Sequence, residues 1–237
     1  MSNSIGRIAA LWRYPVKSMG GEALQSLAVD ERGVIGDRFF ALKDSDGRLG
    51  SGKTTKRFRQ IAGLLDFSAG TEHGAVVIRF RDGRSMRADD PALGPTLTSI
   101  CGMAIKIESE DQDRIMHRDS APLHLLTEAS IAWLRLRSPN VAIDMRRFRP
   151  NIVVATEGDG LVEQAWLGRM IMIGDGLTIR AARPTVRCVM TTLPQGELRA
   201  APAVLQTLTQ QNAAALGIYA EVLRPGRVRI GDDLRFV

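Results

Sequence analysis

Gly168-Arg-Met-Ile-Met-Ile-Gly-Asp175 is the stretch that decides the fold class. A short apolar run ends there at a Gly-Asp pair, and a second apolar run, residues 177–182, begins directly after it. A strand, a tight turn and another strand form the pattern of a β-hairpin. Gly226-Arg-Val-Arg-Ile-Gly-Asp232 is a near copy, one residue shorter. Both stretches predict hairpin turns in a β-rich chain rather than members of a repeat array.

The same alternation of short strands and turns extends over most of the chain. Arg-Gly and Asp-Gly pairs at 32–33, 46–47 and 82–83 bound apolar or alternating runs, and Asp-Gly between strands favours a hairpin. Helices are expected at 128–137, where Thr127 is a suitable N-cap, and at 202–215, whereas 88–95 is predicted to be a loop. The expected strands are residues 5–14, 23–29, 38–43, 75–80, 104–108, 151–155, 169–173, 177–182, 219–223 and 228–236.

These elements predict the fold class and a division of the chain. Many short strands with regular turns favour a mainly β fold with a few helices (α+β), built as a barrel or a sandwich. A polar break at residues 108–114 interrupts the pattern. We therefore expect two parts, residues 1–108 and 109–237.

The composition is that of a soluble globular protein. Of 237 residues, 44% are hydrophobic and 24% are charged, which is ordinary for a chain that buries a core. No apolar run approaches the ~18–20 residues of a membrane-spanning helix, and the first residues carry no apolar segment typical of a signal peptide. Cys101 and Cys188 are too few for a disulfide framework. We expect a cytoplasmic protein without a membrane partner.

The charge is unusual mainly in its arginine content. The net charge is +6, and 27 of the 32 basic residues are Arg. Arginine presents a planar fork that suits phosphate and carboxylate groups, so an anionic ligand is one explanation and a codon bias toward Arg is the other. Aromatic residues make up only 5%, which leaves few surfaces for stacking nucleic acid bases. Nucleic acid is therefore not the expected partner.

Residues 47–54 match a phosphate-binding loop in form. Gly47-Arg-Leu-Gly-Ser-Gly-Lys53-Thr54 fits the pattern G-x-x-x-x-G-K-[ST]. Such a loop works between a parallel strand and the N-terminus of a helix, but here an Asp-Gly turn precedes it and the basic segment 55–60 follows. A hairpin loop that is solvated or faces a substrate is the favoured interpretation, and a nucleotide-binding loop is the alternative.

Three other segments carry candidate chemistry with ordinary alternatives. Cys188 follows Arg187, and a thiolate beside a cation is reactive and binds soft metals, although a buried apolar cysteine explains the local sequence better. Lys17 and Ser18 end the first strand beside two glycines, as in a phosphate site or a simple turn. Arginines at 146, 147 and 149 suit anion recognition or a charged surface.

Two remaining features are weak by themselves. Asp119 and Ser120 place a carboxylate and a hydroxyl in one turn. The histidines at 73, 117 and 124 are too far apart in sequence to predict a metal cluster, and each is interpreted as a structural or surface residue.

Taken together and in order, these segments resemble the MOSC superfamily, named for the C-terminal domain of molybdenum cofactor sulfurase. The resemblance covers nearly the whole chain and is greatest to amidoxime-reducing-component-type proteins and their bacterial relatives. The motifs that carry it are Tyr14-Pro-Val-Lys-Ser18, Gly36-Asp-Arg38, Asp119-Ser-Ala-Pro122 with Leu126-Thr-Glu-Ala-Ser130, Arg147-Phe-Arg-Pro-Asn-Ile-Val153, Pro184-Thr-Val-Arg-Cys188, Gly217-Ile-Tyr219 and Pro225-Gly-Arg-Val-Arg-Ile-Gly-Asp232.

The resemblance implies a MOSC N-terminal β-barrel-like domain and a MOSC domain, as two interlocked β-barrel-like parts with a molybdenum cofactor (Mo-molybdopterin) between them. It implies that Cys188 is the metal ligand and a catalytic residue, and that Asp119 is catalytic and relays protons. The implied cofactor-binding residues are Lys17, Ser18, Arg38, Ser120, Arg149, Asn151, Arg187 and Tyr219. An Arg-rich site suits the anionic cofactor, which can be absent from a purified form of the protein.

The implied activity is oxidoreductase chemistry on a small molecule. We expect reduction of N-hydroxylated (N–O) substrates by oxygen-atom transfer, with electrons from a separate reductase or a ferredoxin-type protein. The loop around Lys53 departs from the Thr-x-Arg pattern of amidoxime-type members, which leaves the preferred substrate open. The alternatives are a sulfur (persulfide) carrier or a cofactor-binding and transfer protein that uses Cys188, and a P-loop nucleotide-binding protein.

Overall fold

The structure is a computed structural model that describes residues 4–110, 117–118 and 120–237. Strands dominate it, and the α-helices of the described chain are α1 (Leu93–Cys101), α2 (Glu128–Arg137) and α3 (Pro202–Asn212). The strands are β1 (Ser4–Arg13), β2 (Glu22–Leu24), β3 (Ser26–Asp30), β4 (Gly33–Val34), β5 (Phe40–Lys43), β6 (Leu49–Ser51), β7 (Phe58–Gln60), β8 (Ser68–Glu72), β9 (Ala75–Arg79), β10 (Ser85–Arg87), β11 (Lys106–Ser109), β12 (Leu123–Thr127), β13 (Ile152–Ala155), β14 (Met170–Ile173), β15 (Leu177–Val186), β16 (Ala215–Arg224), β17 (Gly226–Arg229) and β18 (Asp233–Phe236).

A closed barrel of seven strands forms the larger part of the molecule. The strand order is β13-β12-β16-β15-β14-β18-β1, and β1 pairs again with β13 to close the ring. The pairs are antiparallel except β12 with β13. Alternate residues such as Leu125, Ile171, Ile179 and Ile218 point inward and are fully buried. Closure satisfies the backbone groups that an open sheet would leave exposed at its edges.

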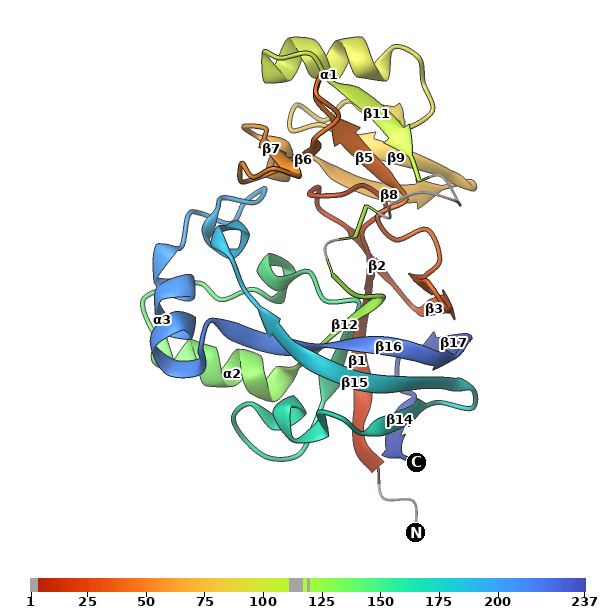
Figure 1. The fold of residues 1–237 in the computed structure, drawn as a ribbon, viewed down its shortest axis with the longest axis vertical. Helices are drawn as coiled ribbons and strands as arrows, with labels where there is room; N and C mark the ends of the chain where they lie inside the picture. Colours follow the sequence, from red (N-terminus) through yellow and green to blue (C-terminus); the bar gives the residue numbers. More distant parts are fainter. Residues whose placement is uncertain (1–3, 111–116, 119) are drawn as a thin grey trace.

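A smaller part lies beyond the barrel, with α1 at its far end (Figure 1). It contains the sheets β11-β5-β6-β7 and β10-β9-β8. Its own core includes Val16, Leu42, Ile78, Leu93 and Leu97, all buried. This core is separate from the core inside the barrel, which supports a division into two structural parts.

The two parts interlock because strands from both ends of the chain pair with each other. β1 is a barrel strand although the residues that follow it enter the smaller part, and β17 from the C-terminal end pairs with β3. The prediction of a mainly β fold with a few helices in two interlocked parts is confirmed. The sequence boundary near residue 108 stays a prediction.

The two Gly-Asp stretches behave differently. The first is the predicted hairpin, since β14 pairs antiparallel with β15 across residues 174–176. The second was predicted to be a hairpin turn and also to lie inside one strand, 228–236, and both expectations are wrong. The chain does turn there, but the two strands do not pair with each other: β17 pairs with β3, whereas β18 pairs with β14 and β1. Gly231 has φ +91 there and turns the chain from one sheet into another. The turns also meet, because Gly174 N donates to the Asp233 carbonyl at 3.0 Å.

Helix boundaries were predicted well where capping residues are present. α2 spans the predicted residues, and the Thr127 hydroxyl accepts from Ser130 N. The expected loop at 88–95 is wrong at its end, because α1 begins at Leu93. Pro95 lies in the first turn of α1, where a helix needs no N–H from it. α3 stops before its predicted end because Ala213 is left-handed and the chain enters β16 at residue 215.

None of the helices in the described ranges is long and apolar enough to span a membrane.

Candidate functional site

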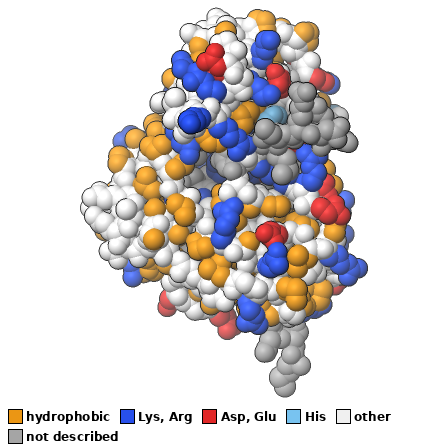
Figure 2. All heavy atoms as spheres, viewed as in Figure 1, with side chains coloured by type: hydrophobic (Ala, Val, Ile, Leu, Met, Phe, Trp, Pro, Cys, Tyr) orange, Lys and Arg blue, Asp and Glu red, His pale blue; other side chains and the backbone are white. Residues whose placement is uncertain are grey.

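A pocket of about 320 Å³ opens where the barrel and the smaller part meet. Figure 2 shows Lys and Arg side chains gathered around the hollow between the two parts. Eight of the ten predicted site residues line this pocket, although they come from six separate stretches of the chain. They are Lys17, Ser18, Arg38, Ser120, Arg149, Arg187, Cys188 and Tyr219.

The two other predicted residues lie elsewhere. Asp119 falls outside the described residues. Asn151 is buried and lines a smaller adjoining cavity. Its side chain joins two barrel strands, because its Oδ1 accepts from His124 N at 3.2 Å and its Nδ2 donates to the Trp12 carbonyl at 3.4 Å. The structure therefore places Asn151 behind the pocket wall.

Lys17 and Ser18 form the wall on the side of the smaller part. The Lys17 N–H donates to the Phe40 carbonyl at 2.8 Å, and its buried ammonium lies 4.9 Å from the centre of the Phe58 ring. Ser18 has φ +62, a left-handed conformation, and its hydroxyl donates to the Gly50 carbonyl at 3.2 Å. The tight turn directs both side chains toward one spot, as a phosphate site requires.

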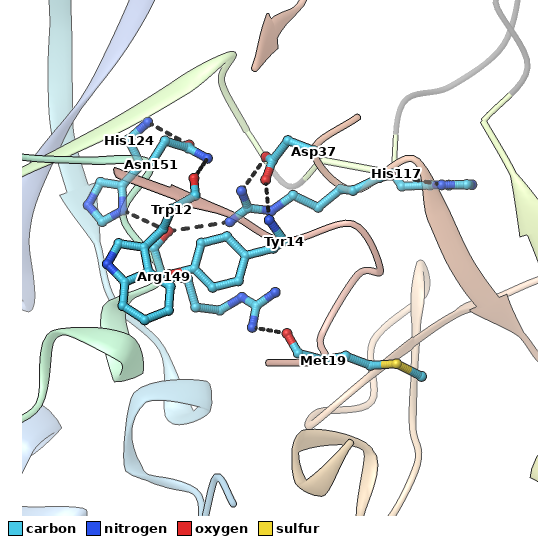
Figure 3. Close-up of polar contacts among 9 residues, drawn as sticks. Trp12, Tyr14, Met19, Asp37, His117, His124, Arg149 and Asn151 are labelled. Atoms are coloured by element: carbon cyan, nitrogen blue, oxygen red, sulfur yellow. Dashed lines mark hydrogen bonds and ion pairs between the residues drawn. The ribbon is translucent and has the colours of Figure 1, made fainter. Parts of the chain in front are cut away.

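Two arginines sandwich a buried tyrosine in the next section of the wall. The guanidinium carbons of Arg38 and Arg149 lie 4.7 and 4.2 Å from the centre of the Tyr14 ring. Arg38 also pairs with Asp37. Arg149 reaches the Met19 carbonyl, as Figure 3 shows. Burial raises the pKa of the Tyr14 phenol above its ordinary value, despite the two cations beside it. Tyr14 therefore remains a neutral support for both guanidinium groups.

Cys188 lies at the end of β15, where the chain leaves the barrel. The thiol is half-buried and begins a short helical turn, in which the Thr191 hydroxyl donates to the Cys188 carbonyl at 3.0 Å. Val186, two residues earlier, is 68% exposed. The thiol thus faces the pocket from a fixed turn and stays within reach of a ligand.

Arg187 is half-buried, and its side chain is largely committed to the protein. Its Nε donates to the Leu216 carbonyl at 2.9 Å and its Nη1 to the Phe148 carbonyl at 3.0 Å. Its Nη2 contacts the Leu216 carbonyl and His124 Nε2. Burial lowers the pKa of Arg187 to about 10. The guanidinium thus connects β16, β12 and the loop that carries Phe148 next to Cys188.

His124 is a pocket residue that the sequence did not reveal. It lies on β12 opposite Tyr219 of β16, and the two rings are 5.7 Å apart. Burial and the neighbouring Arg187 hold its pKa well below the ordinary value. The only local signal is a titratable side chain inside an apolar strand, Leu123-His-Leu-Leu-Thr127. Its partner Arg187 is 63 residues away, so no local pattern connects them.

The charge of the pocket has one sign. Seven of its lining residues are Lys or Arg, and of the lining positions that the structure describes none is Asp or Glu. The cations outside the predicted set are Lys53, Arg147 and Arg183. Like charges concentrated in a partly enclosed, low-dielectric cleft attract anions strongly. The pocket is suited to a ligand that carries several negative charges.

Residues 47–54 do not have the geometry of a nucleotide-binding loop. β5 and β6 are an antiparallel pair joined by the Asp-Gly turn, as predicted for a hairpin. β7, not a helix, follows the segment. Without a helix N-terminus, the anion-binding geometry of a P-loop is missing. Lys53 instead lies on the wall of the basic pocket.

Comparisons with known proteins agree with this architecture. Mitochondrial amidoxime reducing component 2 of Rattus norvegicus is 22% identical over 97% of this chain and 83% of its own length, and the human protein of the same name is 24% identical over 97% and 83%. The crystal structure of the YuaD protein from Bacillus subtilis superposes with a TM-score of 0.53 at 13% identity, over 97% of this chain and 93% of that one.

Family comparisons assign both parts of the chain. Residues 5–111 match the MOSC N-terminal beta barrel domain, and residues 112–235 match the MOSC domain. These two matches cover almost every described residue, including every wall of the basic pocket. The chain belongs to the MOSC domain family.

Proposed function

We propose that the chain binds a molybdenum–pterin cofactor in the basic pocket and reduces N-hydroxylated small molecules there. The observation that carries the proposal is a single pocket lined by seven cations and one accessible thiol, with no carboxylate at its described positions. An anionic cofactor with a phosphate and soft sulfur donors suits that combination. When bound, such a cofactor supplies two-electron oxygen-atom transfer.

The few metal-binding side chains of the pocket also suit a metal ion that is already chelated by an organic group. Within the described chain, no group of three or more His, Cys, Asp or Glu side chains could hold a bare metal ion. Among the lining residues that the structure describes, Cys188 offers the one thiol, and Met190 adds only a neutral thioether. A metal held here therefore needs further ligands from an organic group, and the thiolate of Cys188 adds one protein ligand.

The remaining side chains have roles in binding and orientation. Lys17, Ser18 and Arg38 converge on the side where a phosphate would be neutralised. Arg149, which packs on Tyr14 beside Arg38, would add a further positive charge on the same wall. Ser120 and Tyr219 border the space left for a small substrate, and Asp119, next to Ser120, is the proposed proton relay. Electrons would come from a separate reductase or ferredoxin-type protein.

The names of the relatives support the choice of substrate. They are amidoxime reducing components, at 22–24% identity. Lys53 lies on the wall next to Phe58, in the loop that differs from the Thr-x-Arg pattern of amidoxime-type members. Substrate range is therefore the property in which we expect this protein to differ from them.

The test is the metal and pterin content of protein made in a host that synthesises the cofactor. Wild type should contain molybdenum and pterin in near-equal amounts and should reduce N-hydroxylated compounds with an artificial electron donor. Cys188→Ser should lose molybdenum and activity. Cys101→Ser is the matched control, because Cys101 packs against the core of the smaller part, away from the pocket, and it should behave like wild type.

Two outcomes would contradict the proposal. Full reductase activity in Cys188→Ser would remove the ligand assignment. Absence of both molybdenum and pterin from wild type, with a control protein from the same host correctly loaded, would favour the sulfur-carrier alternative. A persulfide on Cys188, detected by mass spectrometry, would then be the next measurement.

A further inference from the structure

His124 contacts three of the proposed cofactor-binding residues, Arg149, Arg187 and Asn151, although all three are distant from it in sequence. Its Nδ1 lies 3.3 Å from the Arg149 carbonyl, and its Nε2 contacts the Arg187 guanidinium. Its backbone N–H donates to Asn151 Oδ1 at 3.2 Å, and its carbonyl accepts from Asn151 N at 2.8 Å. Figure 3 shows His124 and Asn151 side by side, with Arg149 joined to the imidazole.

These contacts determine the protonation of the ring. A guanidinium has only donors, so Nε2 accepts from Arg187 and carries no proton, while the nearby Leu216 carbonyl accepts from the same guanidinium. A carbonyl has only acceptors, so Nδ1 must carry the proton. His124 is therefore a neutral imidazole with its hydrogen on Nδ1. A second proton would place an imidazolium against Arg187, with Arg149 and Arg38 also close and Tyr219 as the neighbour on β16.

The backbone beside the ring is shaped to admit it. Gly217 of β16 faces the imidazole, and a Cβ built on this glycine would lie 2.6 Å from His124 Nε2. Any side chain at position 217 would collide with the imidazole at Nε2, the atom that faces Arg187. The absence of a side chain there is thus part of the same arrangement.

We propose that His124 is a positioning residue that holds the Arg187 guanidinium and the Arg149 carbonyl at fixed places in the pocket wall. Arg187 immediately precedes Cys188, and Arg149 is the last cation of its loop. The imidazole therefore joins the loop that carries the thiol to the loop that carries an anion-binding arginine. This inference rests on the proposed function only for the ligand that the two loops would hold.

One alternative is that His124 merely fills space in the barrel. Leucine is close in size to histidine and would satisfy that role, whereas it offers neither an acceptor to Arg187 nor a donor to Arg149. Glutamine offers both, through its Oε1 and its amide N–H. The pair His124→Leu and His124→Gln therefore separates packing from hydrogen bonding.

The first experiment needs no cofactor. Long-range ¹H–¹⁵N correlation spectra of the cofactor-free protein should show His124 protonated on Nδ1 only, with no titration at its ordinary pKa. The Arg187 Nη2 signals should match wild type in His124→Gln and should shift and broaden in His124→Leu, where Nη2 keeps only the Leu216 carbonyl. A proton on Nε2, or unchanged Arg187 signals in His124→Leu, would overturn the proposal.

The second experiment uses protein expressed with the cofactor. Molybdenum and pterin content should fall at least tenfold in His124→Leu and stay within twofold of wild type in His124→Gln. Ile171→Ala, a core change elsewhere in the barrel, is the control for lost stability and should keep its load. Equal loading of His124→Leu and wild type would refute the positioning role and leave the proposed function intact.

The outcomes of the two proposals can be distinguished. If wild type contains no cofactor, the proposed function fails, whereas the spectra of the cofactor-free protein still decide the role of His124. If His124→Leu does not fold, the spectrum of wild type still tests the inference, because a proton on Nε2 of His124 would overturn it.

Discussion

Replacing Gly217 with alanine tests both the fold and the pocket wall. Gly217 has φ +77 within β16, and a left-handed conformation costs an L-residue about 1–2 kcal/mol. The new methyl group would also lie 2.6 Å from His124 Nε2 and 2.6 Å from the Leu125 carbonyl. Both distances are far inside van der Waals contact, and overpacking of a core costs about 1–3 kcal/mol. The total predicted loss is about 2–5 kcal/mol.

Gly168 provides a matched control for the conformational cost. Its φ is +79, but no atom lies within 4 Å of a Cβ built on it. Gly168→Ala should therefore lose only about 1–2 kcal/mol. Unfolding in urea, extrapolated to zero denaturant, measures the difference between the two variants. We expect Gly217→Ala to be less stable than Gly168→Ala by about 1–3 kcal/mol, since only the first adds a clash.

The clash also has a functional readout. Because the methyl group would lie 2.6 Å from Nε2, the imidazole must shift, which disturbs its contact with Arg187. Gly217→Ala should lose molybdenum and pterin when Gly168→Ala does not. Equal stability of the two variants would show that His124 and the Leu125 carbonyl yield without cost, and it would refute the reasoning from close contact.

Three other changes test separate features of the structure. Thr127→Val removes the N-cap of α2 and a 2.6 Å hydrogen bond to the buried Glu163 carboxylate, so thermal or urea unfolding should show a loss of about 2–5 kcal/mol. Burial raises the pKa of the Cys101 thiol, so in Cys188→Ser the remaining thiol should react with iodoacetamide more slowly at pH 8 than free glutathione does. A rate equal to that of glutathione would contradict the burial. Lys53→Ala should keep the molybdenum content and raise KM for anionic substrates about two- to fivefold. If wild type binds ATP and Lys53→Ala does not, the P-loop alternative is restored.

Local signals in the sequence were sufficient for elements that local physics determines. The β14–β15 hairpin follows from one apolar run and a Gly-Asp turn, and α2 follows from Thr127 and the apolar spacing after it. α1 was missed because Pro95 and the acidic residues before it resemble a loop. Proline is permitted in a first helical turn, so the signal was ambiguous rather than absent.

Long-range pairing was beyond sequence patterns. The near copy ending at Asp232 reads like the first hairpin, yet β17 and β18 join different sheets. What separates the two cases is the partner available to each strand, and that partner is remote: β3 for one and β1 with β14 for the other. Barrel closure through β1 and β13, about 140 residues apart in sequence, likewise depends on the assembled core.

The candidate site shows the same division. Lys17, Ser18, Arg149 and Cys188 each had an ordinary local interpretation, and only the ordered resemblance to one family grouped them. The structure brings these four residues to one pocket. Whether they bind the cofactor stays a prediction. His124 could not be found in this way, because its importance lies in contacts with residues that are distant in sequence.

Neutral hydrogen-bond acceptors such as His124 explain how the pocket wall accommodates several cations. A buried guanidinium is costly unless acceptors surround it, and Arg187 has carbonyl groups and a neutral imidazole in place of carboxylates. Arg147 is arranged similarly, with the carbonyl groups of Leu193 and Arg199 as its acceptors. Neutral acceptors hold these side chains in place without cancelling their charge. The pocket therefore retains a positive field for a ligand, which a wall of Asp or Glu would have neutralised.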